Sequence, residues 1–215
     1  ASGTPAADRP NILMILADDM GYSDIEPFGS EIKTPNLNQL AADGRILTNM
    51  HVGTVSAISR SMLISGTDHH LVGQGAMWYG DEDARRLFPG YEGHLNERSL
   101  SIAQILQDNG YHTYMAGKWD LGHALADEDD HEKFLHGKSP DQWGFEQSFA
   151  LLHGAVTNQY AHEPQESGRV HYVENGQPVR PNEGQYSSDY WTDKMIAQID
   201  SNRGDGKPFF MYASY

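Results

Sequence analysis

The sequence contains no cysteine in its 215 residues, and this absence excludes two classes of protein. A disulfide framework and a thiol nucleophile both need cysteine, so the fold must be stabilised by a packed core, which a chain of this length can form. Basic residues are also few, with 15 Lys and Arg against 30 Asp and Glu and a formal net charge of −15. Such a charge is unfavourable next to a nucleic-acid backbone, and we expect no nucleic-acid partner.

Long apolar runs are missing as well. No stretch approaches the roughly 20 consecutive apolar residues of a membrane-spanning helix, so we expect no membrane partner. Residues 1–9 are small and polar, as in the segment that follows a cleaved signal peptide. A periplasmic or secreted location is therefore favoured over a cytoplasmic one, although the compartment itself stays unknown at this level.

The most informative stretch that is present runs from Asn11 to Gly21, NILMILADDMG. Its six apolar residues, 12–17, predict a strand buried on both faces in an α/β sheet. Ligands bind beyond the carboxyl ends of such strands, where Asp18 and Asp19 follow. Two adjacent carboxylates repel each other unless a cation holds them, so the pair indicates a divalent metal site. A solvated turn is the alternative interpretation.

A second informative stretch is 53–66, GTVSAISRSMLISG, which predicts a helix over 58–64. Ser56 would lie at the amino terminus of this helix, where backbone N–H groups favour an anion, and Arg60 would lie one turn further on. The alternative is that Ser56 only caps the helix and Arg60 is a surface charge. Lys118 follows a strand predicted at 112–116, and so falls on the same ligand side of the sheet.

The remaining elements follow from apolar periodicity and from capping and turn residues. Thr34 and Pro35 open a helix that ends at Gly44, and a strand at 45–51 completes a βαβ unit. We also expect helices at 99–109 (capped by Ser99) and 187–202, a hairpin turn at Asn175-Gly176 and a buried strand at 208–214.

Two further groups of metal-binding residue types need an interpretation. His69 and His70 are neighbours on one segment, and we expect their rings to diverge, which favours packing or substrate contact over metal ligation. The acidic run 126–131, ADEDDH, predicts a solvated loop, with a weak cation site as the alternative.

Taken together, eight segments in this order resemble the amino-terminal part of the sulfatase family, close to the bacterial arylsulfatases. They are RPNILMILADDMGYSDI, TPNLNQLAADG, SRSMLISGTDHH, PGYEGHLNER, AGKWDLG, GFEQSF, YSSDYWTDKMIAQI and KPFFMYAS. The resemblance implies the alkaline-phosphatase-like α/β/α sandwich, with a mixed, mainly parallel central sheet. It also implies that residues 1–215 form the N-terminal part of a sulfatase catalytic domain.

The resemblance implies a role for each matching residue in cleaving a small-molecule sulfate ester. Asp18 and Asp19 match the family's calcium ligands, with Mg²⁺ as the other possible ion. Ser56 matches the first residue of the C/S-x-P-x-R motif, which is oxidised to formylglycine; its hydrate attacks sulfur and also coordinates the metal. Arg60 matches the arginine that holds this hydrate, and Lys118 matches a lysine that contacts both hydrate and sulfate.

Three features depart from the family pattern. Ile58 stands where the motif has proline, and Asp120 stands where the family has a catalytic histidine after the GKW tryptophan. The family's further histidine, Asp-Asn metal ligands and second lysine lie beyond the matched segments, and a second chain that completes the site is therefore an expected partner. Two alternatives to sulfatase activity therefore stay open: a catalytically degenerate binding protein, and a phosphate-ester hydrolase that uses unmodified Ser56.

Overall fold

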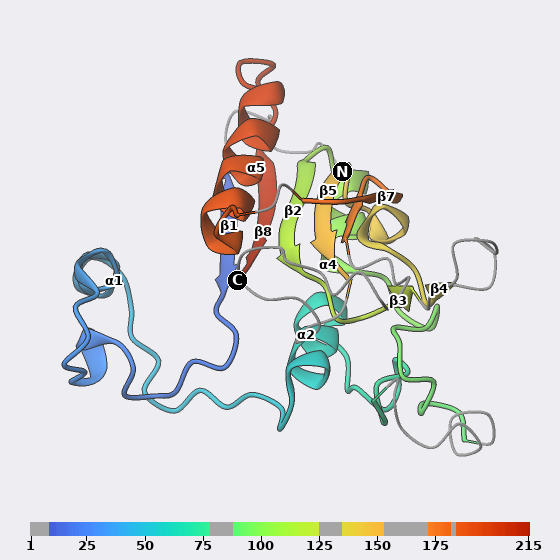
Figure 1. Ribbon diagram of the computed structural model, residues 1–215, viewed down its shortest axis with the longest axis horizontal. Helices are drawn as coiled ribbons and strands as arrows, with labels where there is room; N and C mark the ends of the chain where they lie inside the picture. The colour runs from blue at the N-terminus through green and yellow to red at the C-terminus, as the bar shows by residue number, and fades with distance from the viewer. Residues whose placement is uncertain (1–8, 78–87, 125–134, 153–171, 182–183) are drawn as a thin grey trace.

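The structure is a computed structural model, and it describes residues 9–77, 88–124, 135–152, 172–181 and 184–215. A six-stranded sheet with the strand order β1-β8-β2-β5-β6-β7 forms its centre (Figure 1). The strands are β1 (Ile12–Leu16), β2 (His112–Lys118), β5 (Gln147–Leu151), β6 (Tyr172–Glu174), β7 (Gln177–Val179) and β8 (Phe209–Ser214). The first four in spatial order are parallel, and β6 and β7 are antiparallel, so the expected mixed, mainly parallel sheet is confirmed.

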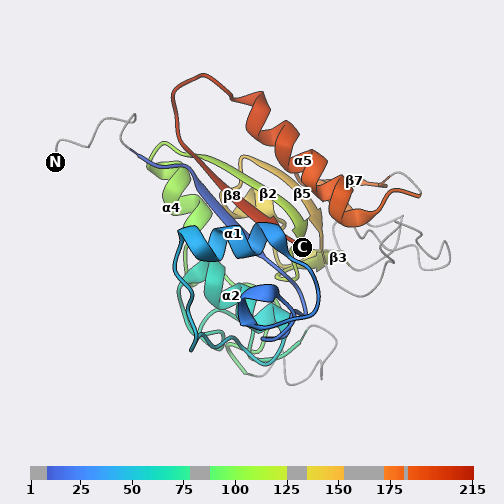
Figure 2. The same ribbon diagram turned by 90° about the vertical axis from the view of Figure 1, so that its left-hand side faces the viewer.

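Helices cover both faces of this sheet, which confirms the expected α/β/α sandwich. Residues that alternate along a strand point to opposite faces, so Met211 and Ala213 of β8 pack on one side and Phe210 and Tyr212 on the other. The first side is covered by α5 (Ser187–Ser201), through residues such as Trp191. The second is covered by α4 (Ile102–Asp108) and by α2 (Ser56–Ser65), as Figures 1 and 2 show.

The strand β1 differs from the sequence prediction. It lies at the edge of the described sheet, beside β8, and only alternate residues contact the core. Leu13 and Ile15 are 57% and 54% exposed, so the prediction of a strand buried on both faces is wrong for this chain. An apolar run of this kind also occurs in a strand with one uncovered face. Its composition predicts burial on both faces only where a second layer covers the strand.

The region after β1 also differs from the prediction. The helix α1 (Pro35–Asp43) forms at the expected place, but residues 45–51 form no strand, so the βαβ unit is wrong. Thr34 does not cap α1 with its side chain; its hydroxyl instead accepts a hydrogen bond of 3.0 Å from the backbone N–H of Glu26 in η2 (Glu26–Phe28). Neither α1 nor η2 buries a residue, and Figure 1 shows both standing away from the sheet.

The other predicted elements are present with shifted ends. The strand at 112–116 extends to Lys118, α2 begins at Ser56, and α4 begins at Ile102 because Ser101, not Ser99, accepts the capping bond from the N–H of Gln104. The hairpin at Asn175-Gly176 joins β6 to β7 as expected. Short elements complete the list: β3 (His123–Ala124), β4 (Leu135–His136) and η3 (Pro140–Trp143).

The acidic run 126–131 lies outside the described residues. Across the part of the chain that the structure describes, no helix combines the length and the apolar character needed to cross a membrane.

Candidate active site

The candidate site forms where three structural elements meet at the carboxyl ends of parallel strands. Asp18 follows β1 after one residue, Lys118 is the last residue of β2, and α2 contributes Ser56 and Arg60. Four of the residues expected to converge therefore lie together, although they are up to 100 positions apart in the chain. The parallel-strand rule that predicted a shared ligand side is the physical reason.

The hydroxyl of Ser56 occupies the centre of this cluster. It donates a hydrogen bond of 2.9 Å to Asp18 Oδ1 and accepts one of 2.7 Å from Arg60 Nε. Ser56 is the first residue inside α2, while the capping position belongs to Val55 in extended conformation. Its oxygen is therefore engaged by the cluster rather than by the helix backbone, and the interpretation of Ser56 as a simple cap is wrong.

Arg60 is fully buried, with 0% exposure, and its guanidinium is held on several sides. Nη1 donates to the carbonyl of Lys118 at 3.0 Å, to Tyr212 Oη at 3.2 Å and to Ser214 Oγ, and Nη2 lies 3.2 Å from Asp18 Oδ1. The alternative that Arg60 is a surface charge is therefore wrong. A guanidinium fixed by several acceptors presents its Nε–H to Ser56 in one defined direction.

Tyr212 and Ser214 are residues that the sequence analysis missed. Both belong to β8, which lies between β1 and β2, and both are buried on the side of the sheet that α2 covers. Their spacing of two within a predicted strand places them on one face, and this was the available signal. Which side of the sheet this face lies on depends on the position of β8 between β1 and β2.

Asp18 is the anion that joins the cluster. Its Oδ2 lies 2.7 Å from Lys118 Nζ, and its side chain is 29% exposed. Partial burial by itself would raise the pKa of this carboxyl, but hydrogen bonds from Lys118 and Ser56 and the charges of Lys118 and Arg60 outweigh it and lower the pKa. Asp18 is therefore ionised at neutral pH and pairs with the Lys118 ammonium and the Arg60 guanidinium.

Asp19 and Asp120 complete the predicted set in different ways. Asp120 lies at the side of the cluster, with Oδ2 3.6 Å from Lys118 Nζ and a side chain only 8% exposed. Asp19 is exposed and adopts a left-handed backbone with φ 51°, and among the hydrogen bonds of the described residues it joins none around Ser56. The structure thus brings five of the six predicted site residues together and leaves Asp19 beside them.

Comparison with known proteins decides the family. The sequence model of the sulfatase family matches residues 10–215. This chain belongs to the sulfatase family. An uncharacterised sulfatase of Schizosaccharomyces pombe is 41% identical over 222 residues, which cover 96% of this chain and 37% of that protein. An arylsulfatase of Klebsiella aerogenes is 35% identical, covering 100% of this chain and 44% of that protein.

Solved structures agree with this assignment. The structure of Ps i-CgsB in complex with k-i-k-neocarrahexaose has a TM-score of 0.74 and 26% identity, and covers 96% of this chain and 44% of that one. The structure of BT4656 with D-glucosamine-2-N,6-O-disulfate has a TM-score of 0.66 and 25% identity, covering 96% and 34%. The chain described here therefore spans less than half the length of each of these four relatives.

The oxygens of this sulfatase site suit a hard divalent cation. Such ions take carboxylate and hydroxyl oxygens as ligands. Asp18 and Asp19 are adjacent in the chain and each offers a carboxylate, and the Ser56 hydroxyl is hydrogen-bonded to Asp18. Lys118 Nζ at 2.7 Å shows that the Asp18 carboxylate already accepts positive charge. Three side chains are fewer than the six to eight oxygens that Ca²⁺ prefers, so water or other groups would supply the rest.

Ile58, at the position where the motif has proline, packs against the loop that leads into α2. Ile58 is half-buried, and Gly53 lies so close that a Cβ on this glycine would come within 2.5 Å of Ile58 Cγ2. The isoleucine therefore packs beneath the loop that leads into α2.

Proposed function

We propose that this sulfatase hydrolyses sulfate esters and that Ser56, Arg60, Lys118 and Asp18 form the part of the active site that faces the sulfate. The observation that carries the proposal is the position of Ser56 Oγ, held 2.9 Å from Asp18 and 2.7 Å from Arg60 at the ends of two parallel strands. An oxygen held between an anion and a guanidinium has its proton and its lone pairs in fixed directions, as a nucleophile requires.

Arg60 and Lys118 supply the positive charge in this proposal. The Arg60 Nε–H points at the attacking oxygen, and would stabilise the negative charge that develops there. The Lys118 ammonium lies beside Asp18 and is 12% exposed, so it can turn toward a sulfate oxygen without leaving the site. Both groups act in a partly water-excluded place, where charge stabilisation is stronger than in bulk water.

Asp18 serves as an anchor for a cation rather than as a general base. Its lowered pKa makes it a weak proton acceptor at neutral pH, while its permanent charge suits a metal ligand. We propose Asp18, Asp19 and Ser56 as ligands of Ca²⁺ or Mg²⁺. A cation bound there would neutralise the charged sulfate oxygens.

The chemical form of position 56 is part of the proposal. Formylglycine at this position would supply a hydrated aldehyde with two hydroxyls, of which one attacks and the other later expels sulfate. Arg60 Nε would hold the attacking oxygen in either form, because its direction is fixed by Tyr212, Ser214 and the Lys118 carbonyl.

One observation favours a second candidate, a phosphate-ester hydrolase. Position 58 carries isoleucine in the motif that otherwise reads Ser-x-Pro-x-Arg, and an unmodified serine hydroxyl is already oriented by Asp18 and Arg60. A serine nucleophile suits phosphate, because water can attack the phosphoryl intermediate. A third candidate, a binding protein without turnover, is favoured by Asp120, whose carboxylate lies beside Lys118 where a sulfate would be repelled.

The deciding experiment compares nitrophenyl sulfate with nitrophenyl phosphate in the full-length protein. We expect sulfate turnover that Ser56→Ala lowers on the order of 10³-fold or more. Ser59→Ala is the matched control, because Ser59 lies on the same helix and, among the described residues, its hydroxyl bonds to two backbone carbonyls at 3.4 Å. Turnover of the phosphate but not the sulfate would establish the second candidate. Binding of the esters without turnover of either would establish the third. Intact mass reports directly whether Ser56 is oxidised.

We also propose that residues 1–215 are the N-terminal part of a sulfatase catalytic domain, completed by further sequence or by a second chain. The uncovered side of β1, next to Asp18, supports this, because a strand carrying a site residue has one apolar face in solvent. The 215-residue chain alone is then expected to turn over no aryl sulfate. Turnover by this chain that Ser56→Ala abolishes would contradict the proposal. A periplasmic or secreted location stays a prediction.

A further inference from the structure

A second cluster of ligand-type side chains lies at the other end of α2. The helix ends at Ser65, Gly66 adopts a left-handed conformation, and residues 67–75 form a tight turn. Backbone bonds fix this turn: the N–H of Leu71 donates to the Asp68 carbonyl at 3.0 Å, and the N–H of Gln74 donates to the His69 carbonyl at 2.8 Å. The ten residues of α2 place this turn about 15 Å from Ser56, so it is separate from the site described above.

The ring of His69 has a fixed hydrogen-bond partner. Its Nδ1 lies 2.9 Å from the backbone carbonyl of Gln74, and a carbonyl can only accept a hydrogen bond. Nδ1 therefore donates to this bond, and in the neutral ring Nε2 holds the free lone pair. A histidine that binds a metal shows this same arrangement, with one ring nitrogen fixed by a carbonyl and the other left for the ion.

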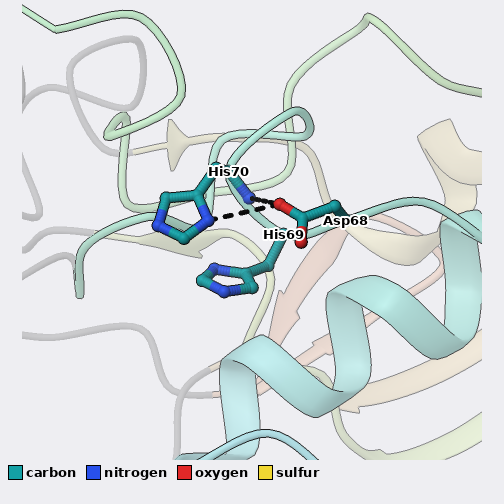
Figure 3. Close-up of side chains that lie close together, drawn as sticks. All are labelled: Asp68, His69 and His70. Atoms are coloured by element: carbon teal, nitrogen blue, oxygen red, sulfur yellow. Dashed lines mark hydrogen bonds and ion pairs between the residues drawn. The ribbon is translucent and has the colours of Figure 1, made fainter.

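His70 and Asp68 bring two more ligand atoms to the same place. Asp68 Oδ1 lies 3.2 Å from His70 Nδ1 and accepts a bond of 3.0 Å from the His70 backbone N–H (Figure 3). The two imidazole rings lie side by side, with centroids 3.9 Å apart and an interplanar angle of 37°. The expectation that neighbouring histidine rings diverge is therefore wrong here, because the turn at 68–70 rotates both onto one side.

The spacing of the ligand atoms is close to that of a metal site. One ligand atom from each of Asp68, His69 and His70 lies within 4.8 Å of the other two. Tetrahedral zinc with bonds of about 2.0–2.1 Å requires donors about 3.4 Å apart. Asp68 and His70 are exposed, so small rotations of their side chains close the difference while His69 stays fixed.

We propose that Asp68, His69 and His70 bind a divalent cation of the zinc class. Two imidazole nitrogens and one carboxylate suit Zn²⁺, Co²⁺, Ni²⁺ and Cu²⁺ rather than Ca²⁺, which prefers oxygen ligands. The carboxyl end of α2 adds the negative end of the helix dipole on this side. Three protein ligands leave a fourth position for water, so the bound ion clamps the turn that follows the helix.

Calorimetric titration of the metal-free protein with zinc tests the proposal. We expect one zinc site whose affinity falls tenfold or more in His70→Ala and in Asp68→Asn, both of which change exposed side chains. His51→Ala is the matched control, because His51 is also an exposed histidine, with a partner 2.9 Å away in Asn49, and lies outside the cluster. The zinc affinity of the His51→Ala variant is expected to equal that of the unaltered protein. Calcium is expected not to compete with zinc for the site.

A second measurement keeps the test independent of any variant. In ¹⁵N NMR of the histidine rings of the unaltered protein, one equivalent of zinc is expected to shift Nε2 of His69 and one ring nitrogen of His70. Unchanged resonances at both histidines would overturn the proposal. So would an affinity that is the same in His70→Ala as in the unaltered protein, or that falls equally in His51→Ala.

Discussion

At the residue scale, Arg60 links the chemistry of the site to the stability of the fold. A fully buried guanidinium is tolerated because its donors meet acceptors from β2, β8 and the segment after β1. The same contacts that direct Nε toward Ser56 therefore also attach α2 to the sheet. A substitution here should affect folding as well as activity.

We expect Arg60→Met to lower the free energy of unfolding by about 1–3 kcal/mol, because Tyr212 Oη and the Lys118 carbonyl lose their buried partner. Urea denaturation followed by circular dichroism measures this. Arg203→Met is the control, since Arg203 is 82% exposed and, within the part of the chain that the structure describes, forms its ion pair with Asp200 across one turn. Equal effects of the two substitutions would contradict the structural role of Arg60.

A second residue-scale feature is His112, which bridges two carboxylates at the start of β2. Its ring nitrogens lie 2.6 Å from Glu146 and 2.6 Å from Asp205, and its side chain is 9% exposed. Burial by itself would lower the pKa of His112, but hydrogen bonds to Asp205 and Glu146 and their charges outweigh it and raise the pKa above 6.5. The charged form is therefore favoured by the folded state.

This raised pKa predicts a direction for stability against pH. The contribution is fully present below the unfolded value of 6.5 and is lost as the pH rises through the higher pKa of the folded state. Urea unfolding at a series of pH values from 6 upward should show this decline, and His112→Gln should remove it. A decline of the same size in His112→Gln would assign it to other groups.

At the element scale, the approach of β2 to β8 positions the site. Gly117 pairs with Ser214, has φ 110°, and leaves so little room that a Cβ would lie 1.8 Å from the Ser214 carbonyl oxygen. Lys118 follows directly and shares its carbonyl with Arg60 and Ser214. The glycine therefore permits the close contact on which the lysine and the arginine depend.

We expect Gly117→Ala to destabilise the fold much more than Gly204→Ala. Both glycines have positive φ, but a Cβ at Gly204 meets nothing within 4 Å. Gly204→Ala thus measures the backbone strain alone, roughly 1–2 kcal/mol, and Gly117→Ala adds overpacking of about 1–3 kcal/mol. Urea unfolding of both variants gives the difference. Equal losses of stability in the two variants would show that β2 and β8 can move apart at Gly117 at little cost in free energy.

At the scale of the whole molecule, the described surface exposes apolar side chains on β1 and on the segment after α1. Leu13 and Ile15 project from one face of the strand, whose outer edge has no partner among the described strands. The segment after α1 adds further exposed apolar residues: Ile46, Leu47, Met50, Val52 and Val55. Apolar patches and open strand edges of this kind mark surfaces where another chain segment binds.

We therefore expect the isolated 215-residue chain to self-associate in a concentration-dependent way. Leu13→Glu with Ile15→Glu should reduce this, because charge on the open face opposes edge pairing. Ile105→Glu is the control, since Ile105 is 48% exposed on α4, which covers the face of the sheet opposite to Leu13 and Ile15. Sedimentation velocity distinguishes the variants. A monomer at all concentrations, before any substitution, would contradict the prediction.

The sequence by itself determined the local elements and the side of the sheet on which the chemistry lies. Apolar periodicity fixes a helix at α5 and a strand at β8, and Asp18 and Lys118 follow strands whose carboxyl ends must meet if the sheet is parallel. The order of eight motifs fixed the sulfatase family. These features depend on neighbours in the chain, and periodicity and motif order report them directly.

Only the tertiary structure decided what surrounds those residues. β8 enters between β1 and β2, and so brings Tyr212 and Ser214, more than 150 positions away, against the guanidinium of Arg60. The same arrangement leaves β1 at an edge, with one face of its apolar run in solvent. Burial and pairing depend on which distant segment arrives at a strand, and no local pattern in the sequence carries that information.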